Sequence, residues 1–488
     1  MANEVPLVVT YKPKEAALEA LQALFRSRTI KPLDLHVAAR MLRDHLGLSY
    51  VPPLRGMPSY DFVLALDGVD ETPPLTIDDT FVYALDAIDP HSPQAEELYD
   101  RVDRPRADLP VRDVQVAIDL PTGLANVWCP KEATFPLFGD LALARAQMRA
   151  SAAAGKGAHG QNVNVVIIDQ GINRNVLAQR VPTANFVGGW FTPEFGKGGP
   201  PPPPGPIPPL IPPGGWPDDG LGPRVTHGTK MASLVLAVAP QARILDLALL
   251  PSHILNLNDP AGGFLSWAVA AYRALVANII WLKLTFPHTF VGRWVLNNSW
   301  AVYDLSTDFP PGDSLNRNYG RNPNHPLNLA VAAAPLVGID VVFAAGNCGQ
   351  FCPDSRCGAG QIGPARGIYG VAAIKNVLTV AAVRGDETWL GYSSQGPADP
   401  IFGSIKPDLC APSQFAGVGD WNRSFTGTSS ACALTAGAVA ARRSLMSPTA
   451  EPPPALRGRA VTTARPVVNQ AAADERRGAG MIDVSTFV

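Results

Sequence analysis

Runs of consecutive apolar residues predict buried strands in this chain. Residues 163–168 read Val-Asn-Val-Val-Ile-Ile and are followed by Asp169. Residues 341–345 read Val-Val-Phe-Ala-Ala and are followed by Gly346 and Asn347. Short apolar runs rich in β-branched residues are typical of strands that are buried on both faces of a sheet. Because open α/β sheets form their sites at the carboxyl ends of strands, the polar residues that follow these runs are candidates for a site.

Other segments have the composition of helices. His227 precedes the run Gly-Thr-Lys-Met-Ala-Ser-Leu-Val-Leu-Ala, and Ser429 precedes a small-residue run from Ala431 to Arg443. Both runs consist largely of helix-favouring residues, so we expect His227 and Ser429 at the starts of helices. The longest apolar stretch, Phe264 to Leu284, is interrupted by an Arg, an Asn and a Lys, which predicts a buried or amphipathic helix rather than a membrane span.

The amino-terminal part mixes both patterns. Strand-like runs occur at Leu7–Tyr11, Phe62–Leu66 and Phe81–Leu85, and amphipathic helical patterns occur at Lys14–Arg26 and Leu35–Leu46. Helices and strands together indicate an α+β module.

Length and composition indicate two domains. With 488 residues and 46% hydrophobic content, the chain has room for a large domain of about 340 residues and a smaller one of about 100 to 150. We predict an amino-terminal domain over residues 1–145 and a second domain over residues 146–488. Residues 197–217 include eleven prolines and predict an extended surface insertion, either a stiff loop at the cleft edge or a docking site for a Pro-binding partner.

Charge is distributed unevenly along the chain. The formal net charge of −2 gives no electrostatic case for binding nucleic acid or an anionic membrane. Residues 1–150 hold 22 acidic and 15 basic residues, which leaves 20 acidic and 25 basic residues in the remainder. The two parts therefore carry about −7 and +5, which fits either an acidic domain docked on a basic one or a solvated acidic surface.

Three separated residues have the chemistry of nucleophilic catalysis. A serine hydroxyl needs a base within hydrogen-bond reach and a third group that orients this base. Ser429 lies in Gly-Thr-Ser-Ser-Ala, His227 in His-Gly-Thr, and Asp169 in Asp-Gln-Gly at the end of a predicted strand. Ser429 is the candidate nucleophile, His227 the general base and then general acid, and Asp169 the residue that orients His227.

These motifs resemble the subtilisin-like serine proteases, the subtilases, in type and in order, since subtilisin also has Asp, His and Ser in this sequence. The resemblance covers roughly residues 150–488. Further segments that fit the family are Val295–Trp300, Val341–Asn347, Tyr392–Pro397, Lys406–Asp408 and Ala411–Pro412. Sedolisin-like relatives have Glu in place of the His and Asp in place of the Asn, so His227 and Asn347 argue against that group.

The resemblance implies a fold and further site residues. The fold would be α/β, a doubly wound and mostly parallel sheet with flanking helices. Asn347 would supply a side-chain donor to the oxyanion, together with the amide of Ser429. The residues implied along the substrate are Ser299, Trp300, Ala301, Ala345 and Gly346.

Some positions depart from the family. Gln170 stands where subtilases usually have Ser or Thr, and Ala433 where they usually have Pro, but neither change removes a reacting atom. Residues 299–302 read Ser-Trp-Ala-Val where the family commonly has Ser-Leu-Gly-Gly, so side-chain preference does not carry over.

The six cysteines leave several interpretations open. Cys348, Cys352 and Cys357 form a cluster beside Asn347 that could bind zinc, form a local disulfide or hold free thiols. Cys432 lies three residues after Ser429 and is expected to pack as a small hydrophobic residue.

No cofactor is required for this chemistry, and no metal site is predicted. Calcium is common in the family as a structural ion, and Asp218-Asp219-Gly220 is a weak candidate for it. The first residues lack a basic and an apolar region of a signal peptide, so the expected location is cytoplasmic, with export by another route left open.

The predicted function is a serine endopeptidase that hydrolyses polypeptides through an acyl-enzyme on Ser429. Many subtilases carry an α+β propeptide, which would make the chain a zymogen that processes itself, although a permanent sensor or docking domain fits equally. The alternatives are a catalytically silent subtilase fold that serves as a binding scaffold and an esterase or amidase with the same triad.

Overall fold

The computed structural model describes residues 5–13, 81–88, 111–118 and 120–124, single residues between 95 and 102, and residues 138–488 apart from 192–224, 250–262, 418–424 and a few shorter gaps. The predicted strand Phe62–Leu66, both amino-terminal helices, the Pro-rich segment 197–217 and residues 218–220 lie outside the described residues.

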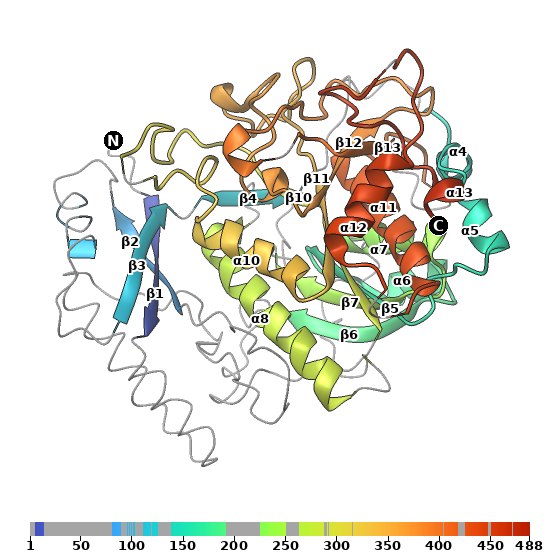
Figure 1. Ribbon diagram of the computed structural model, residues 1–488, viewed down its shortest axis with the longest axis horizontal. Helices are drawn as coiled ribbons and strands as arrows, with labels where there is room; N and C mark the ends of the chain where they lie inside the picture. Colours follow the sequence, from blue (N-terminus) through green and yellow to red (C-terminus); the bar gives the residue numbers. More distant parts are fainter. Residues whose placement is uncertain are drawn as a thin grey trace.

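A seven-stranded sheet forms the centre of the molecule (Figure 1). Its order is β13-β12-β11-β9-β5-β7-β6, and all its neighbouring strands pair in parallel. The strands are β5 (Val163–Asp169), β6 (Asn185–Phe191), β7 (Arg243–Ala248), β9 (Arg293–Asn298), β11 (Ile339–Ala344), β12 (Leu378–Val383) and β13 (Leu409–Pro412). The doubly wound α/β fold predicted from the sequence is confirmed.

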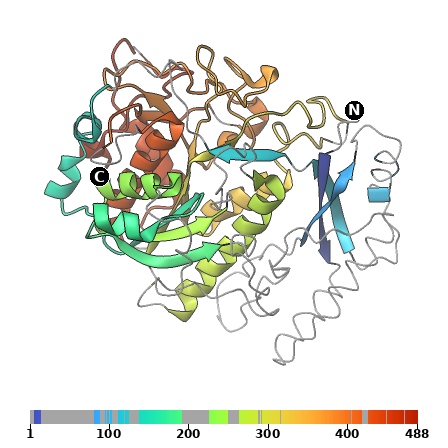
Figure 2. The same ribbon diagram turned by 180° about the vertical axis from the view of Figure 1, so that it is seen from behind.

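The sheet separates two apolar cores, because successive side chains of a strand point to opposite faces. Val166 and Ile168 of β5 share one core with α8 (Leu265–Thr285) and α10 (Pro326–Leu336). Val165 and Ile167 share the other with α7 (His227–Val238) and α11 (Gly427–Ser444), and Figure 2 shows the two pairs of helices on opposite sides of the sheet. The helices that begin at His227 and near Ser429 therefore cover the same face.

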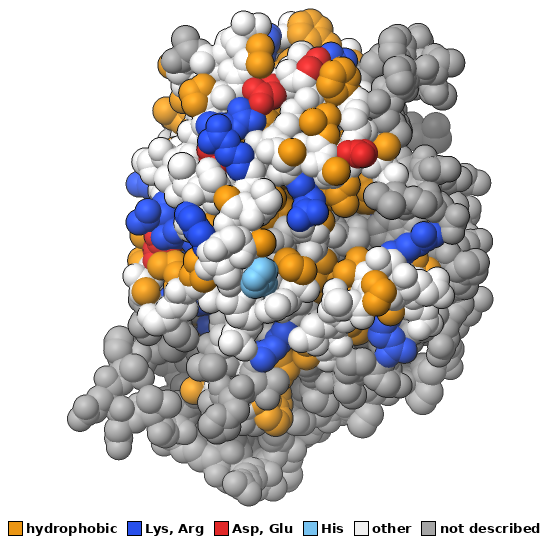
Figure 3. Space-filling view, turned by 90° about the vertical axis from the view of Figure 1, so that its right-hand side faces the viewer, with side chains coloured by type: hydrophobic (Ala, Val, Ile, Leu, Met, Phe, Trp, Pro, Cys, Tyr) orange, Lys and Arg blue, Asp and Glu red, His pale blue; other side chains and the backbone are white. Residues whose placement is uncertain are grey.

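The other helices in the part of the chain that the structure describes are short. They are α4 (Leu141–Gln147), α5 (Ser151–Gly155), α6 (Arg174–Arg180), α12 (Pro453–Thr462), α13 (Val484–Phe487) and the 3₁₀ turns η3 (Ala359–Gln361), η4 (Gly370–Ala373) and η5 (Pro400–Phe402). The face that includes α4, α5 and α13 carries several Lys and Arg side chains and few acidic ones, in keeping with the basic excess after residue 150 (Figure 3).

The predicted helix at Phe264–Leu284 corresponds to α8. Tyr272, Leu275 and Ile279 of this helix are buried in the protein core. Among the helices that the structure describes, none combines the length and the apolar character needed to cross a membrane.

Two small antiparallel sheets among the described residues include strands from the amino-terminal part. One has the order β2-β1-β3 and consists of β1 (Val5–Pro13), β2 (Phe81–Ile88) and β3 (Val111–Ile118). The strands predicted at Leu7–Tyr11 and Phe81–Leu85 lie within β1 and β2. Val116 and Ile118 of β3 belong to the same apolar core as α8 and α10. The α+β assignment of this region and the boundary near residue 145 remain predictions.

The second small sheet joins distant parts of the chain. Its order is β10-β4-β8, with β4 (Pro121–Leu124) paired antiparallel both to β10 (Trp300–Val302) and to β8 (Gly263–Phe264). A strand from the amino-terminal part therefore lies between two strands from the second predicted domain.

Candidate active site

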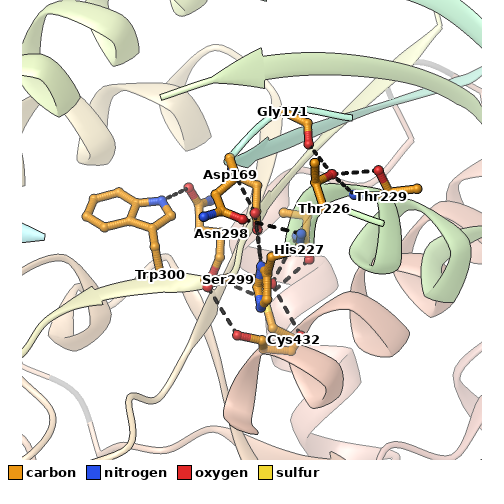
Figure 4. Close-up of polar contacts among 12 residues, drawn as sticks. Asp169, Gly171, Thr226, His227, Thr229, Asn298, Ser299, Trp300 and Cys432 are labelled. Carbon is orange, nitrogen blue, oxygen red and sulfur yellow. Dashed lines mark hydrogen bonds and ion pairs between the residues drawn. The ribbon is translucent and has the colours of Figure 1, made fainter. Parts of the chain in front are cut away.

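Asp169 and His227 form a buried hydrogen-bonded pair. Asp169 is the last residue of β5, His227 is the first residue of α7, and His227 Nδ1 lies 2.9 Å from both carboxylate oxygens (Figure 4). Because carboxylate oxygens accept, Nδ1 carries the hydrogen and Nε2 keeps its lone pair. Nε2 is buried and makes no hydrogen bond to any described residue. The pair thus holds the imidazole in the tautomer that a general base needs.

A chain of hydrogen bonds ties the turn after Asp169 to the start of α7. Thr226, the N-cap, accepts from the amide of Thr229 at 3.1 Å and donates its hydroxyl to the carbonyl of Gly171 at 2.6 Å (Figure 4). The hydroxyl of Thr229 lies 2.6 Å from that of Thr226 and accepts from the amide of Asn173 at 2.7 Å. These bonds fix the position of α7 relative to the segment that follows Asp169.

A second carboxyl group lies beside this turn. Asp246 of β7 is fully buried, and its Oδ2 accepts from the amide of Ile172 at 2.6 Å. Burial raises the pKa of Asp246 well above its usual range, and the nearby carboxylate of Asp169 acts in the same direction. Through this bond Asp246 supports the turn that follows Asp169.

Ser429 is held at the start of α11. Gly427, the first residue of the helix, has a φ of +73°, in the left-handed region that favours glycine. The hydroxyl of Ser429 donates to the carbonyl of Ser299 at 3.1 Å, and the hydroxyl of Ser299 donates to the carbonyl of Ser429 at 3.2 Å. Two reciprocal hydrogen bonds therefore connect the start of α11 to the residue before β10.

Two hydrogen bonds from Thr428 fix the orientation of the Asn347 side-chain amide. Its Oδ1 accepts from the backbone amide of Thr428 at 3.0 Å and from the hydroxyl of Thr428 at 2.9 Å. A backbone N–H can only donate, so the oxygen of Asn347 must face Thr428 and the NH₂ group must face away. Its described partner is the hydroxyl of Tyr303 at 3.5 Å, a weak contact that leaves donor capacity for another oxygen.

The residues implied along the substrate lie on two neighbouring segments. Trp300 and Ala301 belong to β10 and follow Ser299, while Ala345 and Gly346 follow β11. The backbone of β10 pairs with β4, in the register Trp300↔Leu124, Ala301↔Gly123 and Val302↔Thr122. The indole of Trp300 is fully buried and donates to Asn298 Oδ1 at 3.2 Å, so this side chain belongs to the core (Figure 4).

The cysteine cluster contains a disulfide. Cys348 and Cys357 are bonded to each other, and Cys352 is also disulfide-bonded. Of the three interpretations left open by the sequence, the local disulfide is the one found. Cys432 is fully buried in the core, as expected, and burial raises the pKa of its thiol to about 12. No group of three or more potential metal ligands occurs among the described residues.

A sequence model of the subtilase family matches residues 213–480, more than half of the chain. The chain belongs to the subtilase family. Membership supports a serine peptidase hydrolase and confirms the resemblance noted in the sequence. The matched range includes His227, Asn347 and Ser429, whereas Asp169 lies before it. No curated protein matches this subtilase.

Solved structures with similar folds include other proteases. Fervidolysin from Fervidobacterium pennivorans, a keratinolytic enzyme related to subtilisin, has 15% identity and a TM-score of 0.51 over 100% of this chain and 61% of its own. MycP1 from Mycobacterium smegmatis has 20% identity and a TM-score of 0.43 over 76% of this chain and 90% of its own. MycP1 from the ESX-1 type VII secretion system has 21% identity and a TM-score of 0.44 over 75% and 90%.

Some residues of this subtilase site were not predicted from the sequence. Thr428 directly precedes Ser429, so its proximity could have been inferred, but its two bonds to Asn347 could not. Thr226 carries a recognisable N-cap signal, a Thr before a helical run. Asp246 and Tyr303 have no local signal, because their roles arise only from contacts with distant segments.

Proposed function

We propose that this subtilase is a serine endopeptidase with Ser429 as nucleophile, His227 as base and Asp169 as the orienting carboxylate. The observation that carries the proposal is the buried Asp169–His227 pair, which leaves Nε2 as a hydrogen-bond acceptor. The triad assignment extends beyond family membership, because it names individual residues.

The chemical steps follow from this arrangement. On substrate binding, the Ser429 hydroxyl leaves the carbonyl of Ser299 and donates to His227 Nε2, since catalytic hydrogen bonds often form only in the complex. Nε2 takes the proton as Oγ attacks the peptide carbonyl, and His227 then gives that proton to the departing amine. Water attacks the resulting acyl-enzyme in the same way and releases the second product and the free serine.

The negative charge of the tetrahedral intermediate needs donors. Asn347 Nδ2 is suited to this role, because Thr428 holds the amide with its nitrogen turned away. The amide of Ser429, in the first turn of α11, is the second donor and benefits from the positive end of the helix dipole. No metal or cofactor enters these steps.

The substrate in this proposal is an extended polypeptide that pairs with β10 by strand addition. β4 of the same chain pairs with β10 in this manner, which supports both a polypeptide substrate and the idea that the amino-terminal domain docks on the catalytic domain. The same contact supports self-processing near the end of β4. In this proposal the boundary between the domains lies within residues 121–145.

The experiment compares the full chain with Ser429→Ala. We expect a fluorophosphonate probe to label the wild type at Ser429, casein to be hydrolysed, and the Ser429→Ala variant to lose about 10⁶-fold in turnover. Measurement of the intact mass over time shows whether the wild type loses an amino-terminal piece that includes residue 124. The variant should retain this piece.

The outcomes separate the candidate functions. Labelling and hydrolysis without loss of mass would keep the peptidase and remove self-processing. Neither labelling nor hydrolysis, before and after limited removal of the amino-terminal part, would favour the silent scaffold. Hydrolysis of small esters with no cleavage of casein would favour the esterase.

The cellular location remains a prediction. A cytoplasmic site was expected, but disulfides at Cys348, Cys352 and Cys357 are typical of proteins that work in an oxidising compartment. We therefore favour a location outside the reducing cytoplasm. The proposal includes neither nucleic acid nor a membrane as a partner, and structural calcium remains an expectation from the family.

A further inference from the structure

A cavity opens directly beside the residues that hold Ser429. Its lining includes Trp300, one residue after Ser299, and Asn347. The residues that line it are Trp300, Ala301, Val302, Tyr303, Tyr319, Phe343, Ala344, Ala345, Gly346, Asn347, Cys348, Gly367, Tyr369, Val371 and Ala372. A peptide that pairs with β10 and directs its carbonyl oxygen to Asn347 would direct the side chain before the cleaved bond into this cavity.

The cavity is narrow and uncharged. Its empty volume is about 350 Å³ and is partly open to solvent, but between the walls there is room for about one water-sized group. No Asp, Glu, Lys, Arg or His occurs among the described residues that line it. A charged side chain would therefore be desolvated there without a partner, at a large cost in free energy.

Aromatic rings restrict the space. Tyr303 and Tyr319 are buried, and Tyr369 stands edge-on to Tyr319 with ring centroids 6.2 Å apart. The guanidinium of Arg356 lies over the ring of Tyr303, 4.1 Å from its centroid. A ring that moved to admit a larger side chain would have to give up these contacts.

Tyr369 is fixed in place by a bond to the substrate-binding strand itself. Its hydroxyl donates to the carbonyl of Val302 in β10 at 2.8 Å, so the ring spans from the segment before η4 to β10. Tyr319 is fixed in a similar way, because its hydroxyl accepts from the amide of Val371 at 3.2 Å. To admit a large side chain, Tyr369 would have to break its bond to Val302.

We propose that Tyr369 closes this cavity and restricts the residue before the cleaved bond to a small uncharged side chain, such as Ala, Gly or Ser. Tyr369 is thus a specificity-determining residue, and the substrate class is polypeptide with a small residue at that position. A methyl group matches the space for one water-sized group, whereas a phenyl ring exceeds it. The assignment depends on the proposed peptidase site, and it must be tested in a way that does not require turnover.

The first measurement is a ratio of kcat/KM values. Two peptide p-nitroanilides are compared that differ only in Ala or Phe before the scissile bond. We expect the wild type to prefer Ala by about 100-fold and Tyr369→Ala to reduce this ratio at least tenfold through a gain on Phe. Tyr369→Phe keeps the ring and loses only the hydroxyl, so it should retain most of the preference. Competition from β4 affects both peptides equally and cancels in the ratio.

The second measurement needs no catalysis. Affinities of Ser429→Ala and of Ser429→Ala/Tyr369→Ala are measured for peptides that end in Ala or in Phe. Tighter binding of the Ala peptide by the single variant, relaxed in the double variant, supports the inference even if the protein turns over no substrate. Equal affinities in Ser429→Ala, or a preference that Tyr369→Ala leaves unchanged in a folded protein, would overturn it, whereas failure of fluorophosphonate labelling bears only on the proposed function.

Discussion

At the scale of single residues, the candidate site depends on side chains whose hydrogen bonds allow one orientation. Asp169 fixes the tautomer of His227, and Thr428 fixes the amide of Asn347. The carboxylate of Asp169 can only accept, and the backbone amide of Thr428 can only donate. His227 Nε2 and Asn347 Nδ2 therefore face away from these partners. This pre-orientation is what electrostatic stabilisation of a transition state requires.

Replacement of Asn347 by Ala should lower kcat by about 10²- to 10³-fold with a small change in KM, as for the corresponding donor in subtilisin. The physical reason is that the donor acts on charge that develops only in the transition state. Steady-state kinetics on one peptide substrate measure both constants. An equal rise in KM with kcat preserved would show that Asn347 binds the ground state instead.

His325 should make stability depend on pH. It caps α10 by accepting from the amide of Leu327, and burial lowers its pKa to about 3. The folded state therefore binds no proton where the unfolded state does, and stability falls as the pH decreases from about 6.5 towards 3. Between pH 6.5 and 5 the expected loss is about 1.5 kcal/mol.

The control for His325 is His325→Asn, which keeps an acceptor for the cap and does not titrate. Free energies of unfolding from urea denaturation at both pH values should decrease more for the wild type than for this variant. Asp308, whose pKa is raised by burial to about 7, titrates in both proteins and cancels in the comparison. Equal decreases would contradict the assignment.

At the scale of elements, the proposed catalytic geometry depends on the contact between α7 and α11. These helices carry His227 and Ser429 and pack on the same face of the sheet. Gly437 of α11 allows close approach, because a Cβ there would lie 2.7 Å from the carbonyl oxygen of Val235 and 2.9 Å from Cβ of Val238.

Gly437→Ala should therefore lower the free energy of unfolding by about 1 kcal/mol or more, although Ala favours helices. It should also lower kcat, since α7 and α11 must separate. The matched control is Gly458→Ala in α12, where a Cβ meets no atom within 4 Å and a gain of about 0.5–1 kcal/mol is expected. Urea denaturation checks both, and a stabilised Gly437→Ala would refute the packing argument.

At the scale of the whole molecule, segments far apart in the chain meet at the site. The parallel sheet brings the ends of β5, β9 and β11 to one edge, and β4 from the amino-terminal part lies on β10. The cysteines that follow Asn347 add covalent constraints in the same region. Stability and activity should therefore depend on the redox conditions.

The double variant Cys348→Ser/Cys357→Ser should lose about 3 kcal/mol of stability, because the disulfide closes a loop with a sequence separation of 9. Activity should also fall, since this loop includes the bond from the amide of Asp354 to the carbonyl of Asn347 at 2.9 Å. Urea denaturation under non-reducing conditions measures the difference. If the free energy of unfolding of the wild type equals that of the double variant and does not change on addition of reductant, the disulfide has no structural role.

The sequence by itself determined the local structure around Asp169, His227, Asn347 and Ser429. Apolar runs predicted β5 and β11, and small-residue and helix-favouring runs predicted α7 and α11. These signals are local, because strand and helix periodicity depends on neighbouring residues. The order of the motifs was sufficient to predict the family, and the family predicted the doubly wound sheet.

Only the tertiary structure determined how these elements meet. The bond from the Ser429 hydroxyl to Ser299, the bond from the amide of Ile172 to Asp246, and the position of β4 on β10 join residues that are widely separated in the chain. The hydrogen bond from the Tyr369 hydroxyl to Val302 likewise joins two distant segments that line the cavity. Such contacts leave no periodic pattern in the sequence, because burial and hydrogen-bond partners are set by packing between elements.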